Sequence, residues 1–109
     1  MPQGNVPIDQ RQAGIFFAFG HEQLPVGAAA IVFTPATYIV GNRQAQVAYV
    51  TCEDANIRYR YDGTDPTATT GHLLFSGETL TLAGPTNIAS FSAIRAGGVD
   101  GEINVTYEG

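Results

Sequence analysis

The sequence contains no lysine and no tryptophan, and charged residues of either sign are few. Of its 109 residues 14% are charged, whereas ordinary soluble domains have about 25%. Nucleic-acid binding depends on clustered Lys and Arg, and an anionic membrane surface repels a chain whose net charge is −5. We therefore expect neither nucleic acid nor membrane as a partner. The basic residues are scattered along the chain: Arg11, Arg43, Arg58, Arg60 and Arg95.

Cysteine and histidine are also scarce. Cys52 is the only cysteine, which excludes an internal disulfide and a multi-cysteine zinc site. We interpret it as a small buried apolar side chain, because no known nucleophile motif surrounds it. His21 and His72 have no Cys or His nearby at metal-ligand spacing. The sequence therefore predicts no metal site and no cofactor.

Long apolar runs are missing as well. The longest one, residues 24–40, is interrupted by prolines and glycine and falls short of the roughly 20 residues that cross a bilayer. The start, Met-Pro-Gln-Gly-Asn, has neither the basic segment nor the apolar run of a secretory signal. We expect a soluble protein that is made in the cytoplasm.

Short alternating segments separated by turn residues dominate the sequence from residue 28 onward. Turn signals such as Gly41-Asn42 and Asp62-Gly63 recur, and no window shows the 3.6-residue apolar period of a helix. We predict an all-β fold over residues 28–109, a single antiparallel β-sandwich of seven to eight strands that is immunoglobulin-like or jelly-roll-like. The predicted strands cover residues 30–33, 37–40, 44–51, 56–62, 72–75, 78–82, 87–95 and 102–108.

Residues 56–62 alternate most cleanly of these segments. Tyr59 and Tyr61 are expected on one face, and Arg58 and Arg60 on the other. Two arginines on one strand face can stack on aromatic rings or pair with carboxylates of another protein, so we take both as a candidate interface. The alternative is an exposed polar face whose arginines pair within the chain.

The first 27 residues differ in composition from the rest. Their density of proline and glycine opposes a compact subdomain. We predict an extended N-terminal arm over residues 1–27, which a partner binds through an apolar cluster. The alternative, equally weighted, is that residues 15–19 form the first strand of the sandwich. The cluster consists of Ile15, Phe16, Phe17 and Phe19.

Acidic residues are the remaining candidates for chemistry. Asp62 and Asp65 bracket Gly63-Thr64 and precede Pro66, a pattern that suits either a turn or a calcium loop. We favour the turn, because the terminal Glu of a twelve-residue calcium loop is absent. Motifs of hydrolases, phosphate-binding loops and zinc proteases are missing too. The sequence therefore predicts a protein that is not an enzyme.

The order of segments between residues 44 and 108 resembles small β-sandwich proteins of tailed bacteriophages. The segments are Ile-Arg-Tyr-Arg-Tyr-Asp-Gly-Thr-Asp-Pro-Thr-Ala-Thr-Thr-Gly-His-Leu-Leu, then Ser-Gly-Glu-Thr-Leu-Thr-Leu, Asn-Ile-Ala-Ser-Phe-Ser-Ala-Ile and Ile-Asn-Val-Thr-Tyr. The resemblance implies a virion structural protein, such as a head decoration or cement subunit at the capsid surface. Its partners would be the major capsid protein or other virion proteins, and it would be a homo-oligomer, either a trimer or a dimer.

Two other functions stay open. The Asp-Gly-Thr-Asp-Pro-Thr turn also resembles that of a chitobiase-type C-terminal module, so a carbohydrate-binding or receptor-contacting module is the alternative. A small glycosidase ranks last, since it needs two carboxylates about 5 to 10 Å apart in a cleft. Strand alternation predicts that most of the tyrosines face the core, which argues against sugar binding. The tyrosines are Tyr38, Tyr49, Tyr59, Tyr61 and Tyr107.

Overall fold

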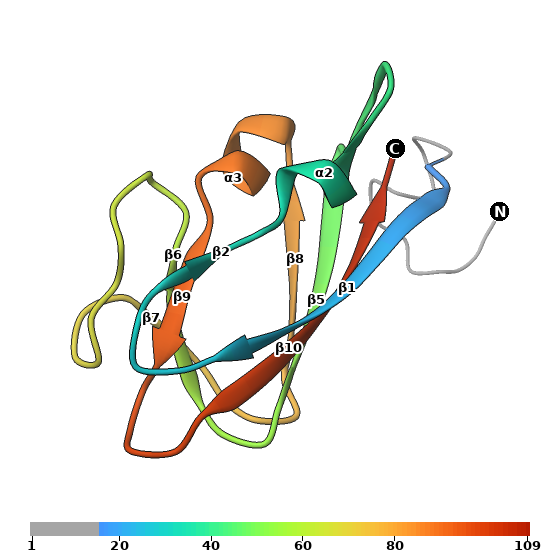
Figure 1. Ribbon diagram of the computed structural model, residues 1–109. Helices are drawn as coiled ribbons and strands as arrows, with labels where there is room; N and C mark the ends of the chain where they lie inside the picture. Colours follow the sequence, from blue (N-terminus) through green and yellow to red (C-terminus); the bar gives the residue numbers. More distant parts are fainter. Residues whose placement is uncertain (1–15) are drawn as a thin grey trace, which may run out of the picture.

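The computed structural model describes residues 16–109, which form ten strands and two short helices (Figure 1). Neither helix is long or apolar enough to span a bilayer, a finding that covers these residues only. In chain order the elements are β1 (Ala18–Val26), β2 (Ile31–Val32), α2 (Pro35–Tyr38), β3 (Ile39–Val40), β4 (Arg43–Gln44), β5 (Val47–Glu53), β6 (Ile57–Arg60), β7 (His72–Leu74), β8 (Thr79–Ala83), α3 (Pro85–Ala89), β9 (Ser92–Arg95) and β10 (Gly101–Glu108).

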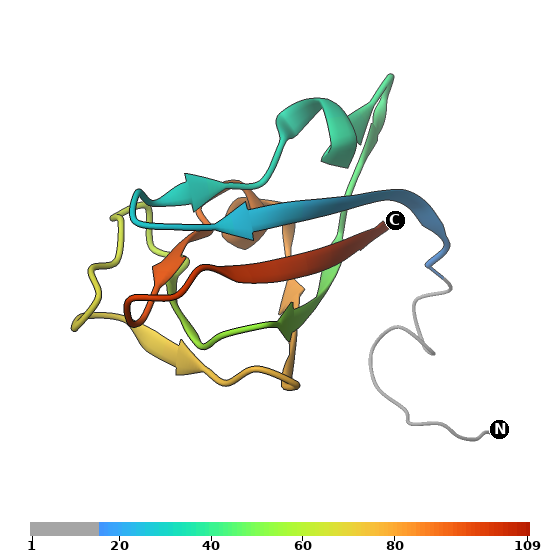
Figure 2. The same ribbon diagram turned by 60° about the horizontal axis from the view of Figure 1, so that its bottom comes forward.

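Two antiparallel sheets of four strands each face one another. Their strand orders are β1-β10-β5-β8 and β2-β9-β6-β7. The predicted all-β antiparallel sandwich is therefore confirmed. The hairpin β3–β4 belongs to neither sheet and projects beyond the sandwich at the end where the C-terminus lies (Figures 1 and 2).

The alternating segments of the sequence form the strands for a simple reason. Along β10 the side chains of Ile103, Val105 and Tyr107 are buried, while the residues between them stay half-exposed. Strand β5 lies between β10 and β8, and it buries Ala48, Val50 and Cys52 on one face, while the other face is buried only at Val47. Period-2 alternation places every second residue in the space between the sheets.

Two predicted strands are partly helical instead. Residues 87–95 were expected to be one strand, yet α3 occupies Pro85–Ala89 and only Ser92–Arg95 is strand. Residues 37–40 likewise begin in α2. Each helix has proline in its first turn, where the fixed φ of proline suits a helix and its missing N–H is not needed. The proline signal lies just upstream of the alternating residues, which explains the error.

Strand β1 corrects the predicted arm. It pairs with β10 from Ala18 opposite Glu108 to Val26 opposite Gly101, so the sandwich begins well before residue 28. Proline and glycine do not oppose this strand, because β1 is an edge strand and tolerates Pro25. Gly20 is needed there, since a Cβ would lie 2.6 Å from the Thr37 carbonyl oxygen. The rest of the predicted arm, residues 1–15, lies outside the described residues.

A group of aromatic rings forms part of the core between the sheets. Phe33 and Phe91 stack with their ring centroids 4.2 Å apart and their planes within 5°. Tyr107 meets Phe33 edge-on at 5.6 Å, and Tyr38 lies 5.7 Å from Tyr107 on its other side. On the far side Tyr59 stacks on Phe91 at 5.9 Å. One continuous row of rings therefore runs through the core.

A single carboxylate connects this row to the edge of the sandwich. The hydroxyl of Tyr107 donates a 2.5 Å hydrogen bond to Glu22 Oε2, which also accepts the Thr34 N–H at 3.0 Å. Burial first, and the Glu22 carboxylate second, raise the pKa of Tyr107 well above its ordinary value of 10. Glu22 thus connects β1, β10 and the segment that leads into α2.

We predict that Tyr107→Phe lowers the free energy of unfolding. The ring and its packing remain, but the Glu22 carboxylate loses the hydrogen bond that the Tyr107 hydroxyl donates to it. A hydrogen bond to a charged group contributes about 1.5–3 kcal/mol to stability. Urea unfolding measures the change. Tyr38→Phe is the matched control, because the Tyr38 hydroxyl makes no hydrogen bond within residues 16–109, and its effect should stay within about 0.5 kcal/mol. Equal losses in both variants would contradict the prediction.

Candidate functional site

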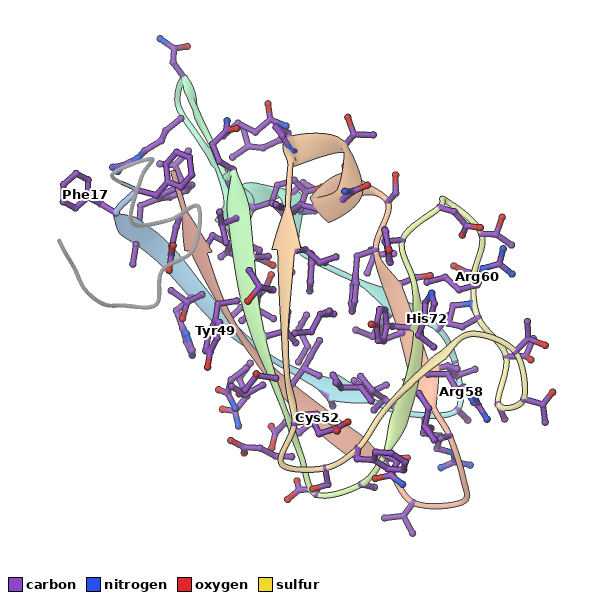
Figure 3. All side chains as sticks on the ribbon, turned by 180° about the vertical axis from the view of Figure 1, so that it is seen from behind. Phe17, Tyr49, Cys52, Arg58, Arg60 and His72 are labelled. Atoms are coloured by element: carbon purple, nitrogen blue, oxygen red, sulfur yellow. The ribbon has the colours of Figure 1, made fainter. Side chains whose placement is uncertain are left out.

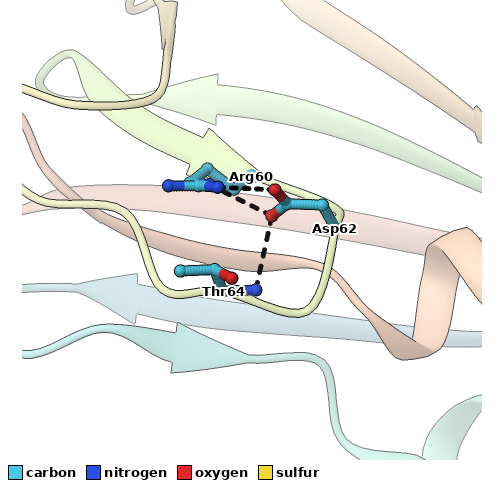
Figure 4. A network of polar contacts seen from close by, with 3 residues as sticks. All are labelled: Arg60, Asp62 and Thr64. Carbon is cyan, nitrogen blue, oxygen red and sulfur yellow. Dashed lines mark hydrogen bonds and ion pairs between the residues drawn. The ribbon is translucent and has the colours of Figure 1, made fainter.

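A long loop, residues 61–71, joins β6 to β7 and contains several hydrogen bonds of its own. Asp62 Oδ1 accepts the Thr64 N–H at 3.3 Å, and Gly63 between them has φ +85° (Figure 4). Thr67 Oγ1 accepts the N–H groups of Thr69 and Thr70 at 3.3 and 3.0 Å. The predicted turn chemistry of the Asp-Gly-Thr-Asp-Pro-Thr segment is therefore confirmed.

Arg60 and Asp62 form a two-point ion pair at the start of this loop. Arg60 Nε donates to Asp62 Oδ1 at 3.0 Å, and Nη2 donates to Oδ2 at 2.5 Å (Figure 4). These bonds, helped by the Thr64 N–H, lower the pKa of the Asp62 carboxyl from 3.8 to about 2. At neutral pH Asp62 is therefore a carboxylate.

Arg58 holds the other end of the loop. Its Nη1 donates to the Gly71 carbonyl at 3.0 Å, and its Nε donates to the Ala68 carbonyl at 3.4 Å. Gly71 has φ +133°, and a Cβ there would lie 3.1 Å from both Pro66 Cβ and the Tyr59 carbonyl oxygen. Only glycine lets the loop lie this close to β6.

Both arginines of the candidate interface are thus engaged within the chain. This is the outcome that the alternative interpretation predicted for Arg58 and Arg60, although Arg58 bonds to carbonyls rather than to a carboxylate. Their role toward another protein stays a prediction. What the structure adds is that both side chains fix the loop between β6 and β7.

Three rings next to the loop continue the core row to the surface. Tyr59 pairs with His72 across the two strands, and their ring centroids are 5.3 Å apart. Tyr61 lies 6.1 Å from His72, with 24° between the planes, and 6.4 Å from Tyr59. Tyr61 is 41% exposed, whereas Tyr38 and Tyr107 are buried and Tyr49 and Tyr59 are half-buried.

An open hollow of about 620 Å³ lies over these rings and the ion pair. In Figure 3 its residues Arg60 and His72 lie together, on the opposite side of the molecule from Phe17. Asn87, in the helix α3 between β8 and β9, also lines the hollow. Its Nδ2 donates to the Ala83 carbonyl at 3.0 Å. The hollow is lined by Arg60, Tyr61, Asp62, Thr70, Gly71, His72 and Asn87.

Sequence reasoning missed this hollow. It found Tyr61, Asp62 and His72 separately, but the register that sets Tyr59 opposite His72 is a property of the sheet. Asn87 could not be placed at all, because the α3 turn was predicted as strand. The alternation of Tyr59 and Tyr61 on one strand was the only signal pointing toward it.

A second surface, the apolar end, surrounds the β3–β4 hairpin. We define it by Phe17, Ile39 and Val40, which are 63%, 43% and 51% exposed. Phe17 exchanges backbone hydrogen bonds with Gly109, while the Arg43 guanidinium lies 4.7 Å above the Phe19 ring and donates to the Gly109 carbonyl. Residues from β1, β4 and the C-terminus, which are far apart in the sequence, therefore lie close together at this end.

The predicted arm residues behave differently from one another. Phe17 is exposed, as partner binding requires, but Phe19 packs partly against the core beneath Arg43. Phe16 is half-buried, and Ile15 lies outside the described residues. The two-way hydrogen bonding of Phe17 with Gly109 places it beside the end of β10, which agrees best with the strand alternative.

Cys52 lies in an environment that disfavours its reactive form, the thiolate. Cys52 is buried, as predicted, and its thiol donates to the Ala55 carbonyl at 3.3 Å. Burial, followed by the nearby Glu78 carboxylate, raises the pKa of this thiol to about 11, which disfavours the thiolate. Within the same residues no three His, Cys, Asp or Glu side chains cluster as metal ligands would.

Asp62 is better suited to holding a ligand than to abstracting a proton. A carboxylate whose pKa is about 2 is a weak general base at neutral pH. Planar polar groups beside exposed ring faces, by contrast, are what a small-molecule binding site needs.

We predict that Arg60→Gln raises the pKa of Asp62 toward 3.8. Because the folded-state pKa is lowered, the pair contributes stability above about pH 4 and loses it as the pH falls toward 2. Carboxyl carbon NMR shifts during an acid titration measure the pKa. Arg95→Gln is the control, since it removes the separate Arg95–Asp100 ion pair, and an unchanged Asp62 in Arg60→Gln would refute the assignment.

Comparison with known proteins gives no significant match for this chain, whether to a protein-family model, to a curated protein sequence or to a solved structure.

Proposed function

We propose that this chain is a non-enzymatic structural protein of a tailed-phage virion, a decoration or cement subunit that binds and bridges proteins at the capsid surface. The observation that carries the proposal is the apolar end. Phe17, Ile39 and Val40 expose large apolar side chains around one projecting hairpin. Large apolar side chains that are exposed at one end of a domain are typical of protein interaction surfaces.

The sequence pattern supports the same proposal. The Asp-Gly-Thr-Asp-Pro-Thr segment forms the β6–β7 loop, and the Ile-Asn-Val-Thr-Tyr segment lies in β10. The phage-like pattern thus consists of residues that build the sandwich. A family whose shared residues are structural suits a protein that works by assembly.

The basic residues support a protein partner rather than nucleic acid. Each arginine within residues 16–109 contacts an acceptor or ring of the same chain. Arg43 bonds to Gly109, Arg58 to the loop carbonyls, and the other two pair with aspartates. Phosphate binding needs clustered cationic groups that are free to displace counterions. The proposed partner is the major capsid protein, and the proposed assembly includes a dimer or trimer of this chain.

Copy number in density-banded particles tests the proposal directly. For a lattice protein we expect a ratio to the major capsid protein of about one, or a simple fraction of it. About a dozen copies or fewer would instead indicate a neck, tail or vertex protein. Absence from the particles would refute the virion proposal.

We predict that Val40→Asp weakens binding to assembled capsids by about tenfold or more, because it places a charge in the apolar contact. Val99→Asp is the matched control. Val99 is 66% exposed, against 51% for Val40, and lies in the β9–β10 loop at the opposite end of the sandwich (Figure 1). Co-sedimentation with capsids measures binding, and equal binding by both variants would remove the apolar end from the proposal.

A further inference from the structure

The hollow beside the β6–β7 loop combines two exposed rings, Tyr61 and His72, with hydrogen-bonding groups. We propose that it is a binding site for a neutral saccharide, with a sugar ring resting on Tyr61 and His72. This inference is independent of the virion proposal, because the hollow and the apolar end lie on opposite sides of the molecule (Figure 3).

The rings provide the apolar half of the site. A pyranose presents C–H groups on one face, and these pack on the faces of aromatic side chains. Tyr61 and His72 have their planes 24° apart, and both are exposed at the hollow. Tyr59 contacts both rings from the core side, at 6.4 and 5.3 Å, so the surface that they offer is supported from beneath.

The polar groups provide the other half. A sugar hydroxyl both donates and accepts, so a pair of neighbouring hydroxyls fits a carboxylate next to a guanidinium. Asp62 has acceptor sites beyond those that Arg60 and Thr64 use, and Arg60 retains N–H groups beyond the two that it gives to Asp62. Asn87 donates through Nδ2, which leaves its Oδ1 free of hydrogen bonds to residues 16–109.

Charge balance favours a neutral ligand. Arg60 and Asp62 are paired at 2.5 Å, so their opposite charges cancel at the hollow. A phosphate or carboxylate would have to compete with Asp62 for Arg60, the one guanidinium among residues 16–109 that lines the hollow. The lining otherwise offers uncharged hydroxyl and amide groups, from Thr70 and Asn87.

The site is organised before any ligand arrives. Arg58 and the close approach at Gly71 fix one end of the loop, and the Arg60–Asp62 pair fixes the other. Binding then costs little ordering of the loop, which favours useful affinity for a small ligand. The volume of about 620 Å³ lies within the range of about 300–1,000 Å³ that is common for small-molecule sites.

An oligosaccharide array tests the proposal with the full chain. The array holds neutral hexose, N-acetylhexosamine and 6-deoxyhexose oligomers beside sialylated and sulfated ones. We expect hits among the neutral sugars, and titration calorimetry with the best hit gives the dissociation constant. No hits, or hits confined to the acidic sugars, would overturn the proposal.

Two variants locate the binding. Tyr61→Ala removes the ring surface, and we expect it to raise the dissociation constant by about tenfold. Phe75→Ala is the matched control, because Phe75 is 48% exposed, against 41% for Tyr61, and does not line the hollow. Its affinity should stay within about twofold. Sugar binding that survives Tyr61→Ala, in a variant whose circular dichroism shows it folded, places the sugar elsewhere and refutes the site.

Discussion

The structure depends on one row of aromatic rings that runs between the two sheets. From Tyr38 the contacts pass through Tyr107, Phe33 and Phe91 to Tyr59, with centroid separations between 4.2 and 5.9 Å. The rings come from both sheets and from the turn α2, so they fix how the layers face each other. Large rigid side chains bury much apolar area with few rotatable bonds, which suits a small domain that has no disulfide.

The two ends of this row explain the two surfaces. One end is Tyr38, the last residue of α2, which leads directly into the hairpin that carries Ile39 and Val40. The next ring, Tyr107, is tied to β1 by its hydrogen bond to Glu22. At the other end the row passes through Tyr59 to Tyr61 and His72, which open onto the hollow. The core therefore positions the exposed rings, and the β6–β7 loop only completes the site around them.

The fold was predictable from the sequence to the extent that alternation is local. The alternation of Ile103, Val105 and Tyr107 predicts β10, and Asp62 followed by Gly63 predicts the turn after β6. The strand order was not predictable, because consecutive strands such as β9 and β10 lie in different sheets. Strand β1 was misread because Pro25 weakens a strand signal in general, yet it costs little on an edge.

The candidate site depends on long-range register, and for that reason it was the least predictable part. His72 becomes significant only opposite Tyr59, and Asn87 only where α3 turns it toward the loop. The two proposed surfaces are also built from different elements. The apolar end is built around β3, β4 and the end of β10, whereas the hollow is built by β6, β7 and α3, so the two surfaces share no residue. The proposed capsid contact and the proposed saccharide site therefore use separate surfaces, so a variant that removes one of them leaves the other measurable.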